Sequence, residues 1–182
     1  MAKRDIKNEL LDCAERLLQK RGYSGFSFND LAKEVGITTA SIHYHFPTKA
    51  NLGECLVKRH TCRFMSALGD ANKFSPAQQL RRYVRLFRNE IAQGRMCLCG
   101  IIAAEADNIP VEIVVEVRSF FRVNERWLTQ VLVAGGLSAK EAALKARLLI
   151  AALEGAMLLA RASGRQQSFD KVASTALKVL GL

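Results

Sequence analysis

The sequence predicts an all-α protein in which a small N-terminal helix-turn-helix domain precedes a larger helical bundle. Apolar residues recur at three- and four-residue steps along nearly the whole chain, and no segment keeps the period-two alternation of a strand. Only 3 prolines and 12 glycines interrupt the 182 residues, which leaves room for long helices. Hydrophobic residues make up 49% of the chain and charged residues 24%, which is ordinary globular usage and excludes a disordered protein.

Start and stop signals delimit four helices in the first third of the chain. Ser27 and Asp30 have the spacing of a capping box, in which each side chain accepts a hydrogen bond from the other residue's backbone amide. Gly36 suits the left-handed turn that ends that helix, and Pro47 disfavours helix in the residue before it. Thr38 or Thr39 caps the helix between them. We therefore expect helices over residues 6–21, 28–35, 39–45 and 48–68.

Longer helices with similar start and stop signals follow. Ser75 and Gln78 form a second capping box around a proline at the first helical position, and Ser138 and Glu141 form a third. Ser168 is expected to cap the last helix. The expected helices cover residues 76–93, 97–107, 110–134, 139–163 and 168–180. On the helix expected over residues 110–134, the side chains expected to face inward are those of Val114, Val117, Phe121 and Leu128.

The second and third short helices have the features of a helix-turn-helix. Ala32 is small enough for a helix crossing, and Gly36 makes the turn. The contacts that fix the crossing angle are expected from Val35, Ile37 and Ile42. Short polar side chains remain on the third helix and can approach base edges in the major groove of DNA. We predict contacts with base edges from Thr38, Thr39, Ala40, Ser41 and His43.

Residues 28–49 read FNDLAKEVGITTASIHYHFPTK, and Leu52 follows shortly after. This stretch resembles the N-terminal signature of the TetR/AcrR family of transcriptional regulators, and the similarity extends over about residues 5–58. The resemblance implies a homodimer that binds a palindromic operator in double-stranded DNA and is released by a small-molecule effector. It also implies a DNA-binding domain over residues 1–47 and an effector-binding and dimerisation domain over 48–182, in which 48–68 is the linking helix.

The resemblance assigns roles residue by residue. The positions that match Thr38, Thr39, Ala40, Ser41 and His43 face bases or nearby phosphates in the family. The positions that match Ser27, Tyr44 and Lys49 lie near the phosphate backbone. This sequence departs from the family at residue 43, where the family usually has tyrosine, because the aromatic hydroxyl comes one residue later, in Tyr44.

The net charge of +10 and the pI near 9.7 favour a polyanionic partner such as nucleic acid. Lys3, Arg4 and Lys7 form either a solvated N-terminal end or a tail that reaches a neighbouring phosphate. The arginines of residues 81, 85 and 88 lie along one helix as either a solvated face or a site for an anionic effector or the DNA backbone.

Two sets of residues in the C-terminal part are candidates for sites. Each has a simpler interpretation as core packing within one chain. The candidate effector pocket is aromatic and rich in methionine, and its residues are Phe87, Met96, Cys97, Phe120, Phe121, Trp127 and Met157. The candidate dimer interface is a wide apolar stripe on the long helix near the C-terminus, which would form a two-fold four-helix contact. Its residues are Ala142, Ala146, Leu149, Ala152, Leu153, Ala156 and Leu159.

The five cysteines are odd in number, and the chain is too long for a disulfide scaffold, so we expect a protein of a reduced compartment, the cytoplasm. No secretory signal or apolar run of spanning length occurs, so we expect no membrane partner. Cys97 and Cys99 have the wrong spacing for a zinc pair, and we predict no metal and no cofactor. No phosphate-binding glycine loop or nucleophile motif occurs, which argues against an enzyme. The alternative to a ligand-released regulator is an effector-free or thiol-responsive DNA-binding dimer.

Overall fold

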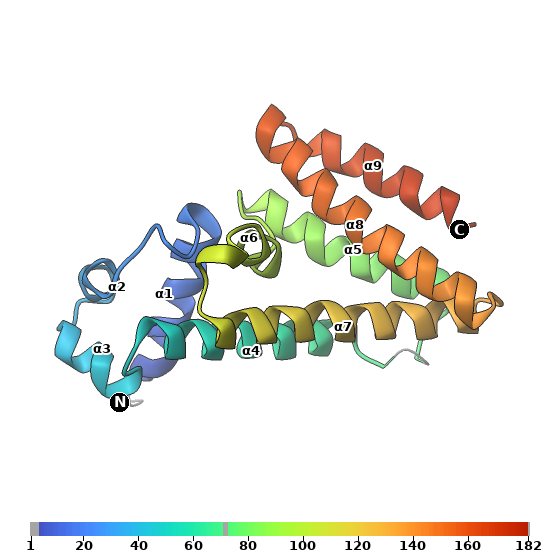
Figure 1. The fold of residues 1–182 in the computed structure, drawn as a ribbon. Coiled ribbons are helices and arrows are strands. Elements are labelled where there is room, and N and C mark those ends of the chain that lie inside the picture. The colour runs from blue at the N-terminus through green and yellow to red at the C-terminus, as the bar shows by residue number, and fades with distance from the viewer. Residues whose placement is uncertain (1–3, 71–72, 182) are drawn as a thin grey trace. The chain divides into compact units, whose positions relative to one another are not determined.

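The structure is a computed structural model that describes residues 4–70 and 73–181. Within these residues it contains only helices and their connections, so the predicted all-α class is confirmed (Figure 1). The helices are α1 (Ile6–Arg21), α2 (Phe28–Val35), α3 (Thr39–His45), α4 (Lys49–Leu68), α5 (Pro76–Ala92), α6 (Leu98–Ala104), the 3₁₀ turn η1 (Ala106–Asn108), α7 (Val111–Ala134), α8 (Ala139–Ser163) and α9 (Gln166–Val179).

The predicted capping residues account for most of these boundaries. The reciprocal hydrogen bonds of a capping box are present both at Ser27, before α2, and at Ser75, before α5. Thr38 accepts a hydrogen bond from the Ser41 amide at the start of α3. Gly36 has a φ of 73°, in the left-handed region where a side chain is disfavoured. The chain therefore starts and stops its helices largely through local chemistry.

The described chain divides into two compact units, and α4 and α7 each contribute to both. The first unit contains described residues up to 61 together with 98–118, and the second contains 62–97 and 119–181. The predicted boundary after residue 47 separates domains by function and stays a prediction. Residues 98–118 group with the N-terminal helices because α6 packs against α1 and Ile113 lies beside Gly53 of α4.

The first unit has a core of aliphatic side chains from its short helices. α1 contacts both α2 and α6, and α2 contacts α3. The fully buried members of this core include Leu10, Leu18, Leu31, Ile42, Leu52 and Leu56. The burial of one residue from α3 and two from α4 anchors those helices in this core.

The second unit combines a helix pair with an aromatic core. α8 and α9 lie side by side, and both contact α5 (Figure 1). Phe64 makes edge-on ring contacts with Tyr83, Phe87 and Phe120 at centroid distances of 5.4–5.8 Å. Trp127 stacks on Tyr83 at 6.0 Å and donates a hydrogen bond to the Gly69 carbonyl oxygen. Such pairs add to the free energy gained by burial of their apolar area.

Two details of the expected helices are wrong. On α7 the expected Val117 and Leu128 are buried, but the expected Val114 and Phe121 are only half-buried, and their preceding neighbours Ile113 and Phe120 are fully buried instead. α9 begins at Gln166 and has no side-chain cap. The expected cap, Ser168, lies inside this helix, and its hydroxyl is 3.1 Å from the Ser163 hydroxyl.

No helix in residues 4–70 or 73–181 combines the length and apolar character needed to cross a bilayer.

Candidate nucleic-acid interface

The turn between α2 and α3 is built from the residues that the sequence indicates. Ile42 of α3 is fully buried, and Ala32 of α2 is almost so, which holds the two helices in close contact. Val35 and Ile37 are only half-buried beside the turn. Phe46 is buried at the end of α3, whereas Phe28 is half-buried. Helix α3 is therefore fixed by one side and leaves its other side to solvent.

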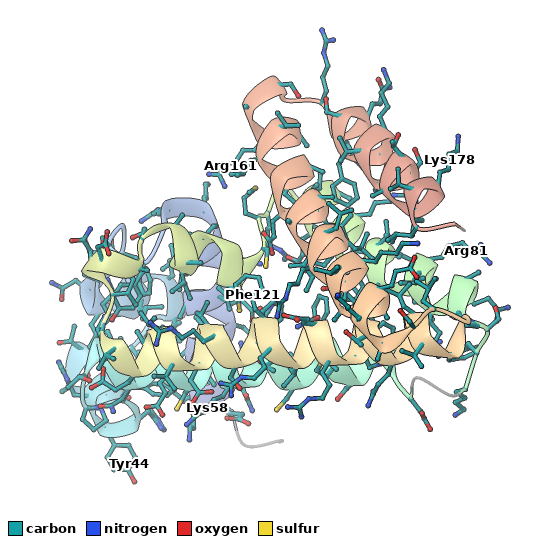
Figure 2. The ribbon with its side chains drawn as sticks, turned by 45° about the vertical axis from the view of Figure 1, so that its right-hand side comes forward. Tyr44, Lys58, Arg81, Phe121, Arg161 and Lys178 are labelled. Atoms are coloured by element: carbon teal, nitrogen blue, oxygen red, sulfur yellow. The ribbon has the colours of Figure 1, made fainter. Side chains whose placement is uncertain are left out.

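The solvent side of α3 carries the predicted DNA-contacting residues. Thr38, Ala40, His43 and Tyr44 are exposed, and the remaining two, Thr39 and Ser41, are half-buried. Tyr44 is 85% exposed, and its side chain projects clear of the ribbon (Figure 2). The structure thus brings these six residues together on one short helix and its cap. Their contacts with DNA stay a prediction.

The geometry separates the neighbours His43 and Tyr44. The His43 ring packs edge-on against Phe28 at 5.0 Å, and its Nδ1 hydrogen-bonds the Pro47 carbonyl oxygen at 3.0 Å. The Tyr44 ring lies edge-on to the His45 ring at 5.2 Å, and Tyr44 is otherwise largely exposed. Its phenolic hydroxyl is therefore available to a partner, whereas the imidazole of His43 already orders the end of α3.

Lys49 is directed into the first unit. Its Nζ donates hydrogen bonds to the carbonyl oxygens of Tyr23 and Phe26, both at 2.5 Å. The same ammonium lies 4.5 Å and 4.4 Å from the centroids of those two rings. Burial lowers the pKa of Lys49, while the carboxylates of Glu105 and Asp30 act in the opposite direction. The predicted phosphate contact is untested, but in this conformation Lys49 holds the loop between α1 and α2.

Glu105 holds the same loop from its other side. Its carboxylate accepts hydrogen bonds from the amides of Tyr23 at 3.0 Å and Ser24 at 3.3 Å. The Lys49 ammonium and the Glu105 carboxylate therefore satisfy both carbonyls and amides of a segment that has no regular secondary structure. Sequence reasoning missed Glu105 because its partners are more than 80 positions away along the chain.

The other predicted backbone contacts have local roles in the described structure. The Ser27 hydroxyl donates to Asp30 at 2.6 Å, and this hydrogen bond lowers the pKa of the Asp30 carboxyl. Arg4 donates to the Val35 carbonyl oxygen and forms an ion pair with Glu9. Lys7 lies 5.9 Å from the Phe46 ring, and Lys3 lies outside the described residues.

Lys33 is an exposed cation beside the turn that the sequence analysis did not select. A shallow hollow of about 510 Å³ is lined by Lys33 together with Asn29, Ala32, Gly36, Ile37 and Thr38. Lys33 thus shares a surface with the N-terminal end of α3. A lysine on the outer side of a predicted amphipathic helix was the only sequence signal for it.

Most of the candidate pocket residues belong to the core of the second unit. Phe87, Phe120 and Trp127 are buried in the aromatic cluster, Cys97 is also buried, and Phe121 is half-buried against Phe120. Met96 and Met157 line a hollow of about 460 Å³ between the end of α5 and the end of α8. Arg95 and Arg161 line the same hollow. Met96 and Met157 are themselves buried, so two of the seven candidates line this hollow from within the packed unit.

Most of the candidate dimer stripe faces inward within the single chain, and its role in an interface stays a prediction. A side chain with no exposed area in one chain has no surface to offer a second copy. The buried members are Ala142, Ala146, Leu149, Leu153 and Ala156, whereas Ala152 is half-buried and Leu159 is 57% exposed. The opposite side of α8 instead exposes Leu144, Leu148, Leu158 and Leu159.

The cysteines offer little support for a thiol sensor at the predicted pair, because Cys97 and Cys99 are both buried. Cys13 is buried too, and burial together with a hydrogen bond to Glu34 raises the pKa of its thiol to about 11. Cys62 is exposed. Across the described residues, no group of three or more His, Cys, Asp or Glu side chains is arranged to hold a metal ion.

Comparisons with protein families match both parts of the chain. Residues 10–54 match the family of bacterial regulatory proteins described as the tetR family. Residues 76–175 match the C-terminal domain of transcriptional regulators described as LmrA/YxaF-like. Together these two family matches cover the helix-turn-helix and most of the second unit.

Solved structures and curated relatives agree with those matches. A TetR transcriptional regulator from Legionella pneumophila has a TM-score of 0.92 and 32% identity over 98% of this chain and 99% of its own. A TetR-family regulator from Agrobacterium tumefaciens has a TM-score of 0.88 and 35% identity over 94% and 95% of the two chains. IcaR of Staphylococcus aureus (strain Newman), a negative transcriptional regulator of the biofilm operon icaADBC, is 40% identical over 53 residues, which are 29% of this chain and 28% of IcaR.

Proposed function

The chain belongs to the TetR family of transcriptional regulators, and on that premise we propose that it is a homodimeric repressor that binds a palindromic operator through α3. Its family and fold are those of transcriptional regulators rather than enzymes. Repression is proposed because IcaR, which is similar over the helix-turn-helix, is described as a negative regulator. The operator, the effector and the direction of regulation are all parts of the proposal.

The observation that carries the proposal is the division of α3 into an anchored side and a free side. Ile42 is fully buried, whereas Tyr44, two residues later, is 85% exposed. The short side chains of residues 38–41 precede them and do not prevent close approach to the floor of a groove. A helix fixed in this way can enter the major groove without rearrangement of its own packing.

Direct reading of bases and contact with phosphates have different candidates. We assign base contacts to Thr38, Thr39, Ala40 and Ser41, because hydroxyl and methyl groups can reach base edges. We assign phosphate contacts to the Tyr44 hydroxyl and the Lys33 ammonium. Both are exposed at the margins of α3, and neither has an ion-pair partner in the described chain.

The proposed dimer uses the outer side of α8. Leu144, Leu148, Leu158 and Leu159 are 51–62% exposed. They follow helical spacing along one side, so a second copy can cover them in an isologous contact. The two-fold axis would present two copies of α3, whose half-sites in DNA lie about 34–36 Å apart or at a multiple of that distance.

The proposed effector site is the hollow lined by Met96 and Met157. Its volume of about 460 Å³ falls in the usual range for small-molecule pockets. A ligand there would release DNA only to the extent that it binds the DNA-free conformation more tightly than the DNA-bound one.

Selection of random duplex DNA by the full chain tests the proposal. We expect enrichment of a palindrome, and footprinting should then show two protected half-sites. Thr39→Ala should alter the preferred base at one position of each half-site, at a cost of about 1–3 kcal/mol for the original base. Lys140→Ala, at an exposed position at the start of α8, serves as the control and should leave the selected sequence unchanged. Enrichment of no palindrome would contradict the proposal.

A further inference from the structure

A second hollow in the second unit differs from the proposed effector site in residues and in charge. It has a volume of about 610 Å³ and lies between α5 and α9. Four arginines of α5 line it, namely Arg81, Arg82, Arg85 and Arg88. None of its lining residues belongs to the hollow around Met157 or to the surface of α3. We call it the arginine groove.

Two of the four arginines are already engaged. Arg88 forms an ion pair with Asp170 of α9 at 2.7 Å. Arg82 donates to the Ala67 carbonyl oxygen at 3.1 Å, and its guanidinium lies 4.5 Å from the centroid of the Phe74 ring. These contacts hold Arg82 and Arg88 in place at the walls of the groove.

The other two arginines carry uncompensated charge. Arg81 and Arg85 are exposed, and neither forms an ion pair or hydrogen bond with any residue in the described ranges 4–70 and 73–181. They are four residues apart on one helix, a spacing at which like charges repel and destabilise the helix. Figure 2 shows the Arg81 side chain extending outward from α5. A bound anion would relieve this repulsion and could accept paired hydrogen bonds from a guanidinium.

The groove also has an apolar part. Phe74, Val84 and Leu177 line it together with the arginines. Phe74 remains 41% exposed, although its ring is large and apolar. A bare inorganic anion would leave that surface in water, whereas an anion with a hydrocarbon portion would cover it and gain free energy from the burial.

We propose that the arginine groove binds an organic anion whose carboxylate or phosphate group lies on Arg81 and Arg85 and whose apolar portion lies against Phe74, Val84 and Leu177. The groove's volume fits a drug-sized molecule or smaller. The site does not depend on DNA binding, so it can be tested separately from the proposed operator.

Calorimetric titration of the DNA-free full chain tests this site with four probes at constant ionic strength. These are octanoate, butyrate, octan-1-ol and inorganic phosphate. Octanoate should bind once per chain, and each methylene removed should weaken binding by up to about fourfold. Octan-1-ol lacks the charge and inorganic phosphate lacks the hydrocarbon, so both should bind at least tenfold more weakly than octanoate.

Two double variants remove the same charge at the same helical spacing. Arg81→Gln with Arg85→Gln should weaken octanoate binding at least tenfold. Arg122→Gln with Arg126→Gln, at exposed positions of α7, is the control and should change it less than twofold. Thermal melting followed by circular dichroism verifies that both variants fold. Leu177→Ala should weaken octanoate more than butyrate.

Several outcomes would overturn the site. Equal losses in the two double variants would mean that only the overall charge matters. Equal affinity for octanoate and octan-1-ol would show that the arginines do not contribute to binding. Equal affinity for octanoate and phosphate would show that the apolar side of the groove does not contribute. If octanoate does not bind while the first double variant alone loses affinity for duplex DNA, then the arginines contact the DNA backbone instead.

Discussion

Lys49 illustrates how one residue can have a role that a family motif does not indicate. Its ammonium satisfies the carbonyl oxygens of Tyr23 and Phe26 and lies over both rings. We expect Lys49→Met to lower the free energy of unfolding by about 1–3 kcal/mol, because two carbonyls lose their donor and methionine keeps only the apolar length. Urea unfolding followed by circular dichroism measures this change.

The matched substitution is Lys33→Met, which removes the same charge from an exposed position of α2. It should leave stability within about 0.5 kcal/mol of the parent. Its effect should appear in DNA binding, as weaker affinity for all duplexes and a salt-dependence slope smaller by about one. A loss of stability as large as that of Lys49→Met would contradict these roles.

The thiols should differ in reactivity according to burial and pKa. Cys13 is buried, and because its pKa is raised to about 11, almost no thiolate exists at pH 8. We expect Cys62, which is exposed, to react first with an aromatic disulfide reagent, and Cys13, Cys97 and Cys99 to react only after urea unfolding. Mass spectrometry of the labelled peptides identifies each site. Early labelling of Cys97 would contradict this expectation and support a thiol-responsive DNA-binding dimer.

At the scale of single elements, the turn between α2 and α3 depends on Gly36. A side-chain Cβ added at this residue would meet no neighbouring heavy atom within 4 Å, so crowding does not require glycine there. The requirement is the φ of 73° alone. Gly36→Ala should cost about 1–2 kcal/mol in unfolding free energy, and Gly36→Asn should cost less, since asparagine tolerates the left-handed region. Chemical denaturation compares the two, and equal costs would contradict the argument.

The elements could be predicted from the sequence where their boundaries depend on local chemistry. Ser27, Thr38 and Ser75 act as caps in the structure as expected. The start of α9 could not be predicted in this way, because it has no side-chain cap and the serine that suggested one bonds to α8. On α7, Val117 and Leu128 face inward as expected, whereas Val114 and Phe121 were misjudged because each directly follows another apolar residue and periodicity alone does not choose between the two.

The candidate sites also differ in whether local sequence or tertiary packing determines them. The exposed side of α3 was predictable because Ile42 and the short polar residues alternate at helical spacing. The dimer stripe was not, because α8 is apolar on two sides and only the packed structure distinguishes them. Ala146 and Leu149 are fully buried, whereas Leu148 is half exposed to solvent. The roles of Lys49 and Glu105 could not be predicted either, because their hydrogen bonds to the loop before α2 join residues that are distant in sequence.

At the scale of the whole molecule, association should depend on the outer side of α8. Leu148→Glu should convert a dimer to a monomer, because an isologous contact places the new carboxylate of each copy in an apolar interface. Sedimentation velocity measures the mass. Val115→Glu adds the same charge at a 48% exposed position of α7 and should leave the dimer intact. If both variants dimerise like the parent, the interface lies elsewhere.

The single tryptophan of the chain has a practical consequence for such experiments. Trp127 is enclosed in the second unit, between Tyr83 and the Gly69 carbonyl. Its emission therefore reports the melting of the unit that contains α8 and α9. The helix α3 lies in the first unit, outside the surroundings of Trp127, so a tryptophan-detected melting curve by itself does not report directly on α3.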